Sequence, residues 1–388
     1  MLTFAGIKFK NPFVVASSPL TKNLDLLKRA EECGAAAVST KLTFIKQPFY
    51  GKCRMYNDPK VGSIVCHDRR LDMEEGLRLV EEGKKHTSLI LFCNITHDGD
   101  GLDGWVKLAK AHEDAGADLI ELNLVCPNIS LTARRLGREI ETTGALISQD
   151  PRTASAVVRA VKESVKIPVV AKLTPNVTDV SEVAAACEAA GADGVTLAGC
   201  QMSLPPPDIY NPTRPYPLLA GAAFGSLGGP AARLISYAQV ALIAQRVKIP
   251  IVGGGGIENW RHCVDFMMWG STLVTACTSL MWYGFELIPK MIQGMEKFMA
   301  EQGYSSYEEL IGLALPSLRP AHELDAIPGA AFVNSELCNG CKLCLRPGHC
   351  TAVRMVDGKA LVDPEKCIGC SICAAICPRK AITMREAS

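Results

Sequence analysis

Short apolar runs alternate with amphipathic stretches along most of the first 315 residues. Eight runs have the length of a buried strand, and they are Pro12–Ala16, Ala35–Thr40, Ser88–Asn94, Asp118–Leu124, Pro168–Leu173, Gly194–Ala198, Pro250–Gly253 and Thr272–Cys277. The stretches between them show helical spacing, and they are Leu24–Cys33, Met73–His86, Trp105–Ala115, Thr153–Ser164, Val180–Ala190 and Ala231–Val247. Strands that are apolar on both faces are typical of parallel sheets. The pattern therefore predicts an α/β fold, a closed TIM-type (β/α)8 barrel.

An open, doubly wound sheet is the alternative arrangement of these elements. That fold usually carries a G-x-G-x-x-G turn after its first strand, and this chain has none there. Instead, Gly34, Gly116 and Gly191 each follow a predicted helix and precede a predicted strand. Glycine in that place caps the helix and turns the chain back. The repetition favours the barrel.

Three connections are longer than the loops that usually join strands to helices. They are Phe44–Leu71, Pro127–Gln149 and Gly199–Gly229. Each follows a predicted strand, which places it at the C-terminal rim, where barrel enzymes carry their active sites. The third is rich in proline and is expected to be stiff. Such loops serve as lids or subunit contacts, and the sequence leaves both roles open.

Composition narrows the function classes. With 48% hydrophobic residues, 21% charged residues and a net charge of +1, the chain has an ordinary globular composition and no electrostatic reason to bind nucleic acid or an anionic membrane. Phe266–Phe285 lacks charges, but polar residues and Gly270 interrupt it, so it is predicted as a helix end, a strand and a helix start rather than a membrane span. Met1–Lys10 shows no signal-peptide pattern, so a cytoplasmic location is expected.

Helical and strand periodicity ends after Leu315, where prolines become frequent. The predicted organisation is a catalytic barrel over residues 1–315, a linker over 316–331 and a small α+β ferredoxin-like domain over 332–388. Eight of the 17 cysteines lie between Cys338 and Cys377. Scattered cysteines are usually reduced core residues in such a chain, whereas a crowded set needs a separate explanation.

The crowded cysteines follow the spacing of iron–sulfur ligands. Two runs of C-x2-C-x2-C are each followed by a further cysteine, and the spacing resembles that of a bacterial two-cluster ferredoxin. In that pattern the last cysteine of each run ligates the other cluster. The predicted ligand sets are Cys338, Cys341, Cys344 and Cys377 for one [4Fe-4S] cluster, and Cys367, Cys370, Cys373 and Cys350 for the other. Zinc is the alternative, although zinc sites usually use two pairs with a longer gap.

The stretch E-L-N-L-V-C-P-N, Glu121–Asn128, joins a buried strand to a thiol. Pro127 cannot continue the strand, so Cys126 is expected at the C-terminal rim. A free cysteine is more often a small buried hydrophobe, which is the alternative. Lys41 and Lys172 also end apolar strands, where a buried ammonium needs a partner. A flavin, which gains negative charge on reduction, is one partner, and a surface lysine is the other interpretation.

Glycines near the end of the barrel predict a phosphate site. Gly228-Gly229 ends the third long connection, Gly253–Gly256 follows the seventh strand, and Thr278 follows the eighth. Glycines let backbone N–H groups approach an anion, and barrels often bind phosphate after strands seven and eight. Tight barrel turns also use glycine.

Six segments together carry a family resemblance. They read A-S-S at Ala16–Ser18, S-T-K at Ser39–Lys41, E-L-N-L-V-C-P-N, A-K-L-T-P-N-V-T-D at Ala171–Asp179, F-G-S-L-G-G at Phe224–Gly229 and G-G-G-I at Gly254–Ile257. Over residues 1–310 the chain resembles the dihydroorotate/dihydropyrimidine dehydrogenase family, and the fourth segment favours the dihydropyrimidine branch, which also carries a two-cluster ferredoxin domain.

This resemblance implies a flavoprotein oxidoreductase of pyrimidine metabolism that acts on CH–CH groups. It implies an FMN lined by Ala16, Ser17, Lys41, Asn94, Asn123, Lys172, Thr196, Gly228, Gly229, Gly255, Gly256 and Thr278. A C=C bond beside a carbonyl accepts hydride from reduced FMN, and Cys126 is expected to exchange the proton at the neighbouring carbon. Asn123, Asn128 and Asn176 are the candidates for binding the ring of a small cyclic substrate.

Two stretches depart from the dihydropyrimidine pattern at positions that face the substrate in that family. Cys66-His67-Asp68 stands where the family has Asn-x-Glu, and Gly199-Cys200 stands where it has Asn-Thr. The flavin and proton chemistry are therefore better supported than uracil or thymine as substrate. The second connection contains Arg134, Arg135 and Arg138. These arginines either meet a carboxylate of the substrate or form a solvated face, and the interleaved acidic residues favour the solvated face.

The sequence shows no nicotinamide-binding segment, so electrons are expected to pass to or from a separate NAD(P)H-oxidising flavoprotein subunit or a soluble ferredoxin. The resemblance also implies a homodimer or hetero-oligomer. Two other activities remain open: a dihydroorotate dehydrogenase-like reaction, and a non-catalytic relay of electrons between redox partners. A relay has no need of the Cys126 thiol beside a flavin, and this favours an enzyme.

Overall fold

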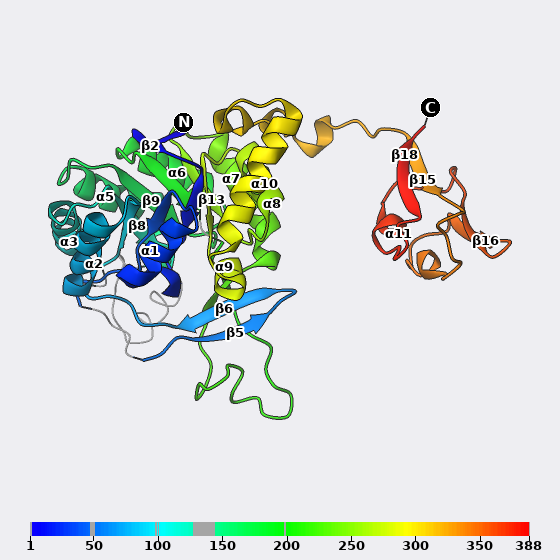
Figure 1. The fold of residues 1–388 in the computed structure, drawn as a ribbon. Coiled ribbons are helices and arrows are strands. Elements are labelled where there is room, and N and C mark those ends of the chain that lie inside the picture. The colour runs from blue at the N-terminus through cyan, green and yellow to red at the C-terminus, as the bar shows by residue number, and fades with distance from the viewer. Residues whose placement is uncertain are drawn as a thin grey trace. The chain divides into compact units, whose positions relative to one another are not determined.

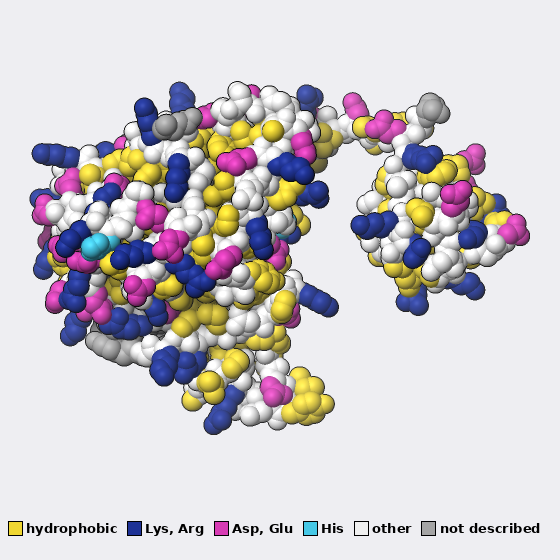
Figure 2. Space-filling model, viewed as in Figure 1, with side chains coloured by type: hydrophobic (Ala, Val, Ile, Leu, Met, Phe, Trp, Pro, Cys, Tyr) yellow, Lys and Arg dark blue, Asp and Glu magenta, His cyan; other side chains and the backbone are white. Residues whose placement is uncertain are grey.

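The computed structural model describes residues 2–46, 51–97, 99, 101–126, 144–197 and 199–387. The chain divides into two compact units, Met1–Ser317 and Leu318–Ser388 (Figure 1). Figure 2 shows Lys and Arg side chains interspersed with Asp and Glu over the visible face of the larger unit. That mixture agrees with the balanced net charge of the chain.

The larger unit is a closed barrel of eight parallel strands that follow one another in chain order. The strands are β3 (Phe13–Val15), β4 (Ala37–Ser39), β7 (Ile90–Ile95), β8 (Leu119–Leu124), β9 (Val169–Leu173), β10 (Gly194–Leu197), β13 (Ile251–Gly254) and β14 (Leu273–Ala276). Each coincides with one of the eight apolar runs, so the predicted barrel is confirmed and the open sheet is excluded.

Helices surround the barrel (Figure 1). They are α1 (Leu24–Glu32), α2 (Met73–His86), α3 (Asp103–Asp114), α5 (Pro151–Lys162), α6 (Val180–Ala189), α7 (Arg233–Ala244), α8 (Trp260–Met268), α9 (Thr278–Tyr283) and α10 (Leu287–Gln302). Short polar side chains begin several of them; Asp72 forms a capping box with Glu75, and Asn259 accepts hydrogen bonds at the start of α8. Such caps fix where each helix starts and therefore how long the preceding loop is.

An aromatic plug closes the N-terminal end of the barrel. The hairpin of β1 (Leu2–Phe4) and β2 (Ile7–Phe9) places Phe4 and Phe9 against Phe92 of β7, with ring centroids about 6 Å apart. All three rings are fully buried. The apolar end is thus sealed, and the opposite, C-terminal end is left for polar side chains.

A second, antiparallel sheet stands at the C-terminal rim, in the order β11-β12-β6-β5. Its strands are β5 (Arg54–Asp58), β6 (Gly62–His67), β11 (Gln201–Ser203) and β12 (Gly225–Gly228). They come from the first and third long connections, which were predicted only as rim loops. Figure 1 shows the β5–β6 hairpin reaching out from the barrel. The sheet ties these two connections together beside the barrel mouth.

The smaller unit contains two short antiparallel pairs. One joins β15 (Gly329–Val333) to β18 (Ile382–Glu386), and the other joins β16 (Val353–Val356) to β17 (Lys359–Val362). The helical turns are η7 (Leu343–Leu345) and α11 (Ile372–Ala375). Its core is small and includes cysteine side chains, so ligands to those thiols would contribute much of its stability.

Phe266–Phe285 divides as predicted into the end of α8, strand β14 and helix α9. Within the described ranges, no helix has both the length and the apolar character needed to cross a membrane.

Candidate active site and iron–sulfur centre

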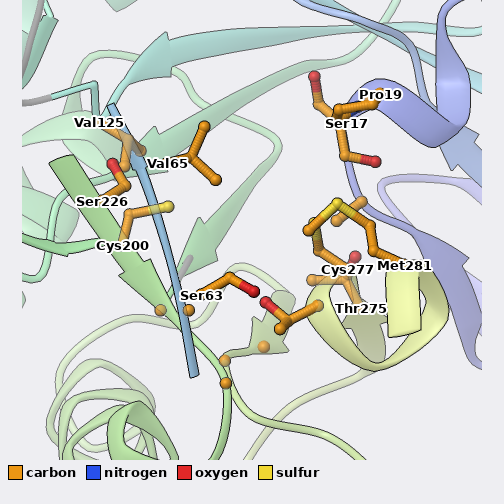
Figure 3. A pocket seen from close by; sticks show the side chains of 18 of the residues that line it. Ser17, Pro19, Ser63, Val65, Val125, Cys200, Ser226, Thr275, Cys277 and Met281 are labelled. Atoms are coloured by element: carbon orange, nitrogen blue, oxygen red, sulfur yellow. The ribbon is translucent and has the colours of Figure 1, made fainter. Parts of the chain in front are cut away.

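A deep pocket opens at the C-terminal end of the barrel. The ends of β8, β9, β13 and β14 line it, together with β6, β12 and the first turns of α9. Its empty space is about 1220 Å³, solvent at its mouth included. In Figure 3, Val65, Ser226 and Cys200 lie on one side of the pocket, and Ser17 and Met281 lie on the other.

Glu121 is the hub of the polar network at the base of the pocket. Its carboxylate accepts hydrogen bonds from Ser39 of β4, Asn94 of β7, Lys172 of β9 (3.2 Å) and Thr196 of β10 (2.9 Å). All five side chains are buried. A buried carboxylate is costly unless it is paired and hydrogen-bonded, and here four neighbouring strands satisfy it.

Lys172 and Lys41 are equally hidden but have different electrostatic surroundings. Burial is the largest influence on Lys172 and disfavours its charge, but Glu121 together with the neighbouring thiols of Cys200 and Cys126 raises the pKa of Lys172. Burial, and next the like charge of Arg70, lower the pKa of Lys41 to about 8, although Asp68 attracts it. The pKa values of the two lysines shift in opposite directions because Asp68 is shared by two cations, Lys41 and Arg70, whereas Glu121 is paired with Lys172 alone.

The Lys41–Asp68–Arg70 group forms a buried ionic triad on the pocket wall. Lys41 donates to the Asp68 carboxylate, and the Arg70 Nη1 lies 3.1 Å from the same oxygen. Asp68 and Arg70 come from the end of the first long connection, directly after β6. Two basic groups and one acidic group leave an excess of positive charge beside the pocket, which favours an anion there.

Cys126 lies at the end of β8 on the pocket lining, as predicted, and is partly buried. Asn123 lies three residues before Cys126. Its side-chain amide donates a hydrogen bond to the Asn94 side chain at 3.0 Å and thus connects the pocket lining to the Glu121 network. Two further thiols, Cys200 and Cys277, also line the pocket. Burial, and next the proximity of Cys126, raise the pKa of Cys200 to about 12, so this thiol stays protonated at neutral pH.

Glycines pack against one another at one end of the pocket. A Cβ at Gly255 would lie 2.8 Å from the Gly199 Cα, one at Gly256 would lie 2.5 Å from the Gly229 carbonyl oxygen, and one at Gly229 would lie 2.6 Å from the Gly62 Cα. Gly229, Gly255 and Gly256 also have positive φ angles. Only glycine fits these positions, and the result is a cradle of exposed backbone of the kind that binds phosphate.

Most of the residues predicted to line the flavin meet in this pocket, and they are Ala16, Ser17, Lys41, Asn123, Lys172, Gly228, Gly229, Gly255, Gly256 and Thr278. Asn94 and Thr196 lie beneath the lining, hydrogen-bonded to Glu121. Asn176 does not line the pocket; its amide donates to Thr174 and to the Cys200 carbonyl and accepts from the Met202 N–H. The hydrogen-bonding groups of the Asn176 side chain are therefore used by Thr174 and by the backbone of Cys200 and Met202. Asn128 and the arginines of the second connection lie outside the described residues.

The two departures from the family pattern have different environments. Asp68 and Cys200 line the pocket, whereas the Cys66 side chain packs with Tyr216 in a separate apolar cluster. In the first departure, Asp68 therefore contacts the pocket, and Cys66 does not.

Asp68 and Cys200 stand at the two predicted substrate-facing departures, whereas the sequence did not indicate the roles of Glu121 and Arg70 in the site. Glu121 stands inside the E-L-N-L motif, where an acidic residue in an apolar strand was the available signal. The triad depends on Asp68 meeting Lys41 across 27 positions in sequence, which no local pattern indicates.

The eight cysteines of the smaller unit line two separate cavities. Cys338, Cys341, Cys344 and Cys377 line one, and Cys350, Cys367, Cys370 and Cys373 line the other. Both groupings match the predicted crossover of the fourth cysteine. Backbone N–H groups point at some of the sulfurs; Ala381 N lies 3.3 Å from Cys377 Sγ, and Ala331 N lies 3.5 Å from Cys367 Sγ. Backbone hydrogen bonds from Ala360 and Gly340 lower the pKa of Cys338, which favours its thiolate.

Comparisons with known proteins agree with both units. The family model described as dihydroorotate dehydrogenase matches residues 1–299, and the model described as 4Fe-4S binding domain matches residues 360–383. The NAD-dependent dihydropyrimidine dehydrogenase subunit PreA of Escherichia coli (strain K12) is 29% identical over 355 residues, covering 88% of this chain and 84% of that protein.

Two archaeal relatives cover the barrel. The dihydroorotate dehydrogenase B (NAD(+)) catalytic subunit of Pyrococcus furiosus is 34% identical over 80% of this chain and 96% of its own length. The subunit of the same name from Methanothermobacter thermautotrophicus is 32% identical over 80% of this chain and 97% of its own length. The chain therefore belongs to the dihydroorotate dehydrogenase family of flavin-dependent oxidoreductases that act on CH–CH bonds, and it carries a C-terminal 4Fe-4S binding domain.

Proposed function

We propose that this protein is an FMN enzyme with two [4Fe-4S] clusters that interconverts a CH–CH bond and a C=C bond beside a carbonyl in a small cyclic compound, as a dihydropyrimidine dehydrogenase does. One observation carries the proposal. A single pocket gathers a glycine cradle, two buried lysines and a thiol, while the other unit of the same chain holds two cavities with four thiols each.

The pocket residues fit FMN. The cradle of Gly228, Gly229, Gly255 and Gly256 offers backbone to a phosphate, with Thr278 beside it. Lys172 and Lys41 supply positive charge at the wall, where a reduced flavin carries negative charge. A bound flavin supplies hydride transfer at N5. The glycine cradle would therefore hold the phosphate end and leave the lysines for the ring end.

Cys126 is the residue we assign to proton exchange with the substrate. It is partly buried, lies on the pocket lining, and follows a strand whose preceding residues are locked by the Glu121 network. Cys200 is a less suitable acid or base, because burial raises its pKa to about 12. Asn123, fixed by Asn94, and the undescribed Asn128 are the proposed contacts to the amide-like edges of a ring.

Two clusters fit the smaller unit. The cavities separate the thiols into the two sets expected of a two-cluster ferredoxin, and N–H groups directed at sulfur favour anionic ligands. Among the described residues, no three His, Cys, Asp or Glu side chains are placed to hold a single metal ion. Thiols spread around a cavity suit a cubane, which fills the space between its ligands, better than zinc.

The substrate proposal follows the dihydropyrimidine branch. The relative PreA, by name a dihydropyrimidine dehydrogenase subunit, matches through 88% of this chain, whereas the dihydroorotate dehydrogenase subunits match 80% of it. A dihydroorotate-type reaction is the second candidate, favoured by the 34% identity of the Pyrococcus subunit and by the positive excess of the Lys41–Asp68–Arg70 triad, which suits a carboxylate. Electrons would pass between the clusters and a separate flavoprotein subunit or ferredoxin, in a homodimer or hetero-oligomer.

Cofactor analysis tests this proposal. Protein purified without oxygen is expected to contain one FMN and about eight irons per chain, and heat-released flavin should migrate as FMN in chromatography. A Cys350→Ser variant should lose about half of the iron and retain its FMN, because the two units are separate compact bodies. Finding zinc in place of iron, or FAD in place of FMN, would contradict the cofactor assignment.

A further inference from the structure

The two cysteine-lined cavities differ in the charge around them. Lys342 and Arg379 line the cavity of Cys338, Cys341, Cys344 and Cys377, and Lys359 donates to the Cys338 carbonyl oxygen at 2.5 Å. Lys380 follows Arg379 directly. These four exposed side chains, Lys342, Lys359, Arg379 and Lys380, are called the basic rim here.

The basic rim keeps an excess of positive charge. Glu336 and Asp357 are the acidic residues that most closely precede Lys342 and Lys359 in the sequence, and the four basic groups outnumber these two acidic neighbours. The ion pairs among the described residues of this unit are His322 with Glu323 and Lys366 with Asp363, and neither uses a rim residue. Figure 2 shows Lys and Arg side chains together with Asp and Glu side chains on the visible face of this unit.

The surroundings of the second cavity are different. Lys366 and His349 are the basic side chains that line it. Lys366 is paired with Asp363 at 3.3 Å, and a His349 ring nitrogen lies 3.4 Å from the Cys370 Sγ. Ile368 and Ile372 line the same cavity and are 75% and 41% exposed. The first cavity therefore presents a charged edge to solvent, and the second presents an apolar one.

Cys341 makes the charged edge suitable for electron exchange. It is exposed, whereas Cys344 of the same ligand set is buried; Cys370 is likewise exposed in the other set, so the charge of the surroundings is what distinguishes the two cavities. A cluster held there would thus be nearest to solvent at Cys341, next to Lys342. A polar, charged surface of this kind is typical of brief encounters between redox proteins, while permanent subunit interfaces are larger and more apolar.

We propose that the basic rim is the docking surface for a small electron-carrier protein with a carboxylate-rich face, which exchanges electrons with the cluster at Cys338, Cys341, Cys344 and Cys377. This inference rests on the proposed clusters. In the step, one electron leaves the reduced carrier and enters the cluster, so the carrier is oxidised and the cluster is reduced. The carboxylates of the carrier meet the rim lysines and Arg379, which steers the encounter and brings the two centres together.

Stopped-flow mixing of the oxidised holoprotein with a reduced, strongly acidic soluble ferredoxin tests the inference. The second-order rate constant should fall steeply as ionic strength rises, because exposed charges are screened. Lys380→Glu, and the double variant Lys342→Glu/Lys380→Glu, should lower the rate about tenfold or more at low ionic strength. Arg319→Glu is the matched control, since Arg319 is exposed in the same unit, lines neither cavity and lies more than 20 positions from every rim residue in the sequence.

A carrier of opposite charge gives the reciprocal result. Reduced holoprotein should transfer electrons to a positively charged cytochrome c faster after charge reversal at the rim than before it. Iron content of each variant shows whether both clusters are loaded, and Lys380→Glu alters no cavity-lining residue. Rates that are equal in all variants, or a parent rate that does not respond to salt, would overturn the docking surface while leaving the clusters in place. A parent protein without iron–sulfur clusters would overturn both proposals.

Discussion

At the residue scale, the barrel keeps charged side chains buried at the base of its pocket. Lys172 and Glu121 form a buried pair, and three uncharged side chains complete the hydrogen bonds of the carboxylate. Removing one member of such a pair is far more harmful than removing an exposed pair, since the remaining charge stays buried. The pair therefore both stabilises the barrel and keeps an ammonium in the pocket wall.

Glu121→Gln is expected to lower the free energy of unfolding of the barrel by about 3 kcal/mol. Glu258→Gln is the matched control; it breaks the Arg233–Glu258 ion pair of 2.9 Å, which is more exposed, and should cost about 1 kcal/mol or less. Tryptophan fluorescence in a denaturant titration measures this unit alone, because all four tryptophans lie between residues 105 and 282. Equal losses for both variants would show that Lys172 does not depend on Glu121.

Lys41 gives a pH dependence of known sign. Burial and then Arg70 lower its pKa to about 8, below its ordinary value, so between about pH 8 and pH 10 the folded protein binds fewer protons at this site than the unfolded chain. Stability from this group consequently rises with pH in that window. In flavin-free protein, the parent should gain about 2 kcal/mol over Lys41→Met between pH 8 and pH 10. A difference between parent and variant that stays constant with pH would mean that Lys41 remains charged throughout.

At the element scale, the rim sheet β11-β12-β6-β5 determines the shape of the pocket mouth. It forms where Gly62 of β6 meets Gly228 of β12, and a Cβ at Gly62 would lie 2.1 Å from the Gly228 carbonyl oxygen. Gly62 also has a φ of +144°. β6 can approach β12 this closely because Gly62 lacks a side chain. The contact continues into the glycine cradle at Gly229, where an added Cβ would lie 2.6 Å from the Gly62 Cα.

Gly62→Ala should therefore push β6 away from β12, weaken FMN binding at least tenfold and lower stability by about 2 kcal/mol or more. Gly221→Ala is the matched control, because Gly221 has a φ of +109° but no atom within 4 Å of the added Cβ. The control separates backbone strain from the clash. Thermal unfolding and fluorescence titration of FMN measure the two effects, and similar values for both variants would contradict the proposed contact.

Some elements of the fold could be predicted from the sequence, and others could not. The eight barrel strands were predictable because each is a continuous apolar run, such as Leu119–Leu124, whose signal is local. The rim sheet was not, because its strands are short, mixed in polarity and paired across about 160 positions, as Ser63 is with Gly228. Cys126 and both lysines were identified because a proline or a charge interrupts an apolar run. The Asp68–Arg70 contribution arises from tertiary contact alone.

At the scale of the whole molecule, the protein combines a pocket for two-electron chemistry with a unit suited to one-electron carriers. The cysteines agree with this division, because the two proposed ligand sets lie within residues 338–377 and Cys126, the residue proposed for proton exchange, lies in the barrel. A flavin can accept a hydride and release single electrons, so it is the natural link between such parts. The Cys126 thiol in the pocket is what separates the enzyme proposal from an electron relay, which would also combine a flavin with clusters.

Reoxidation of the reduced protein tests most directly whether electrons from the iron–sulfur unit reach a substrate beside Cys126. Anaerobic protein is reduced with dithionite, freed of reductant and mixed with uracil, thymine, orotate or cyclic enones while flavin and iron–sulfur absorbance are followed. The account predicts that one compound reoxidises both chromophores and that Cys126→Ala slows this step by at least a hundredfold, with cofactor content unchanged. Reoxidation by none of the compounds but by a ferredoxin or flavoprotein, equally fast in parent and variant, would contradict the account and favour a relay.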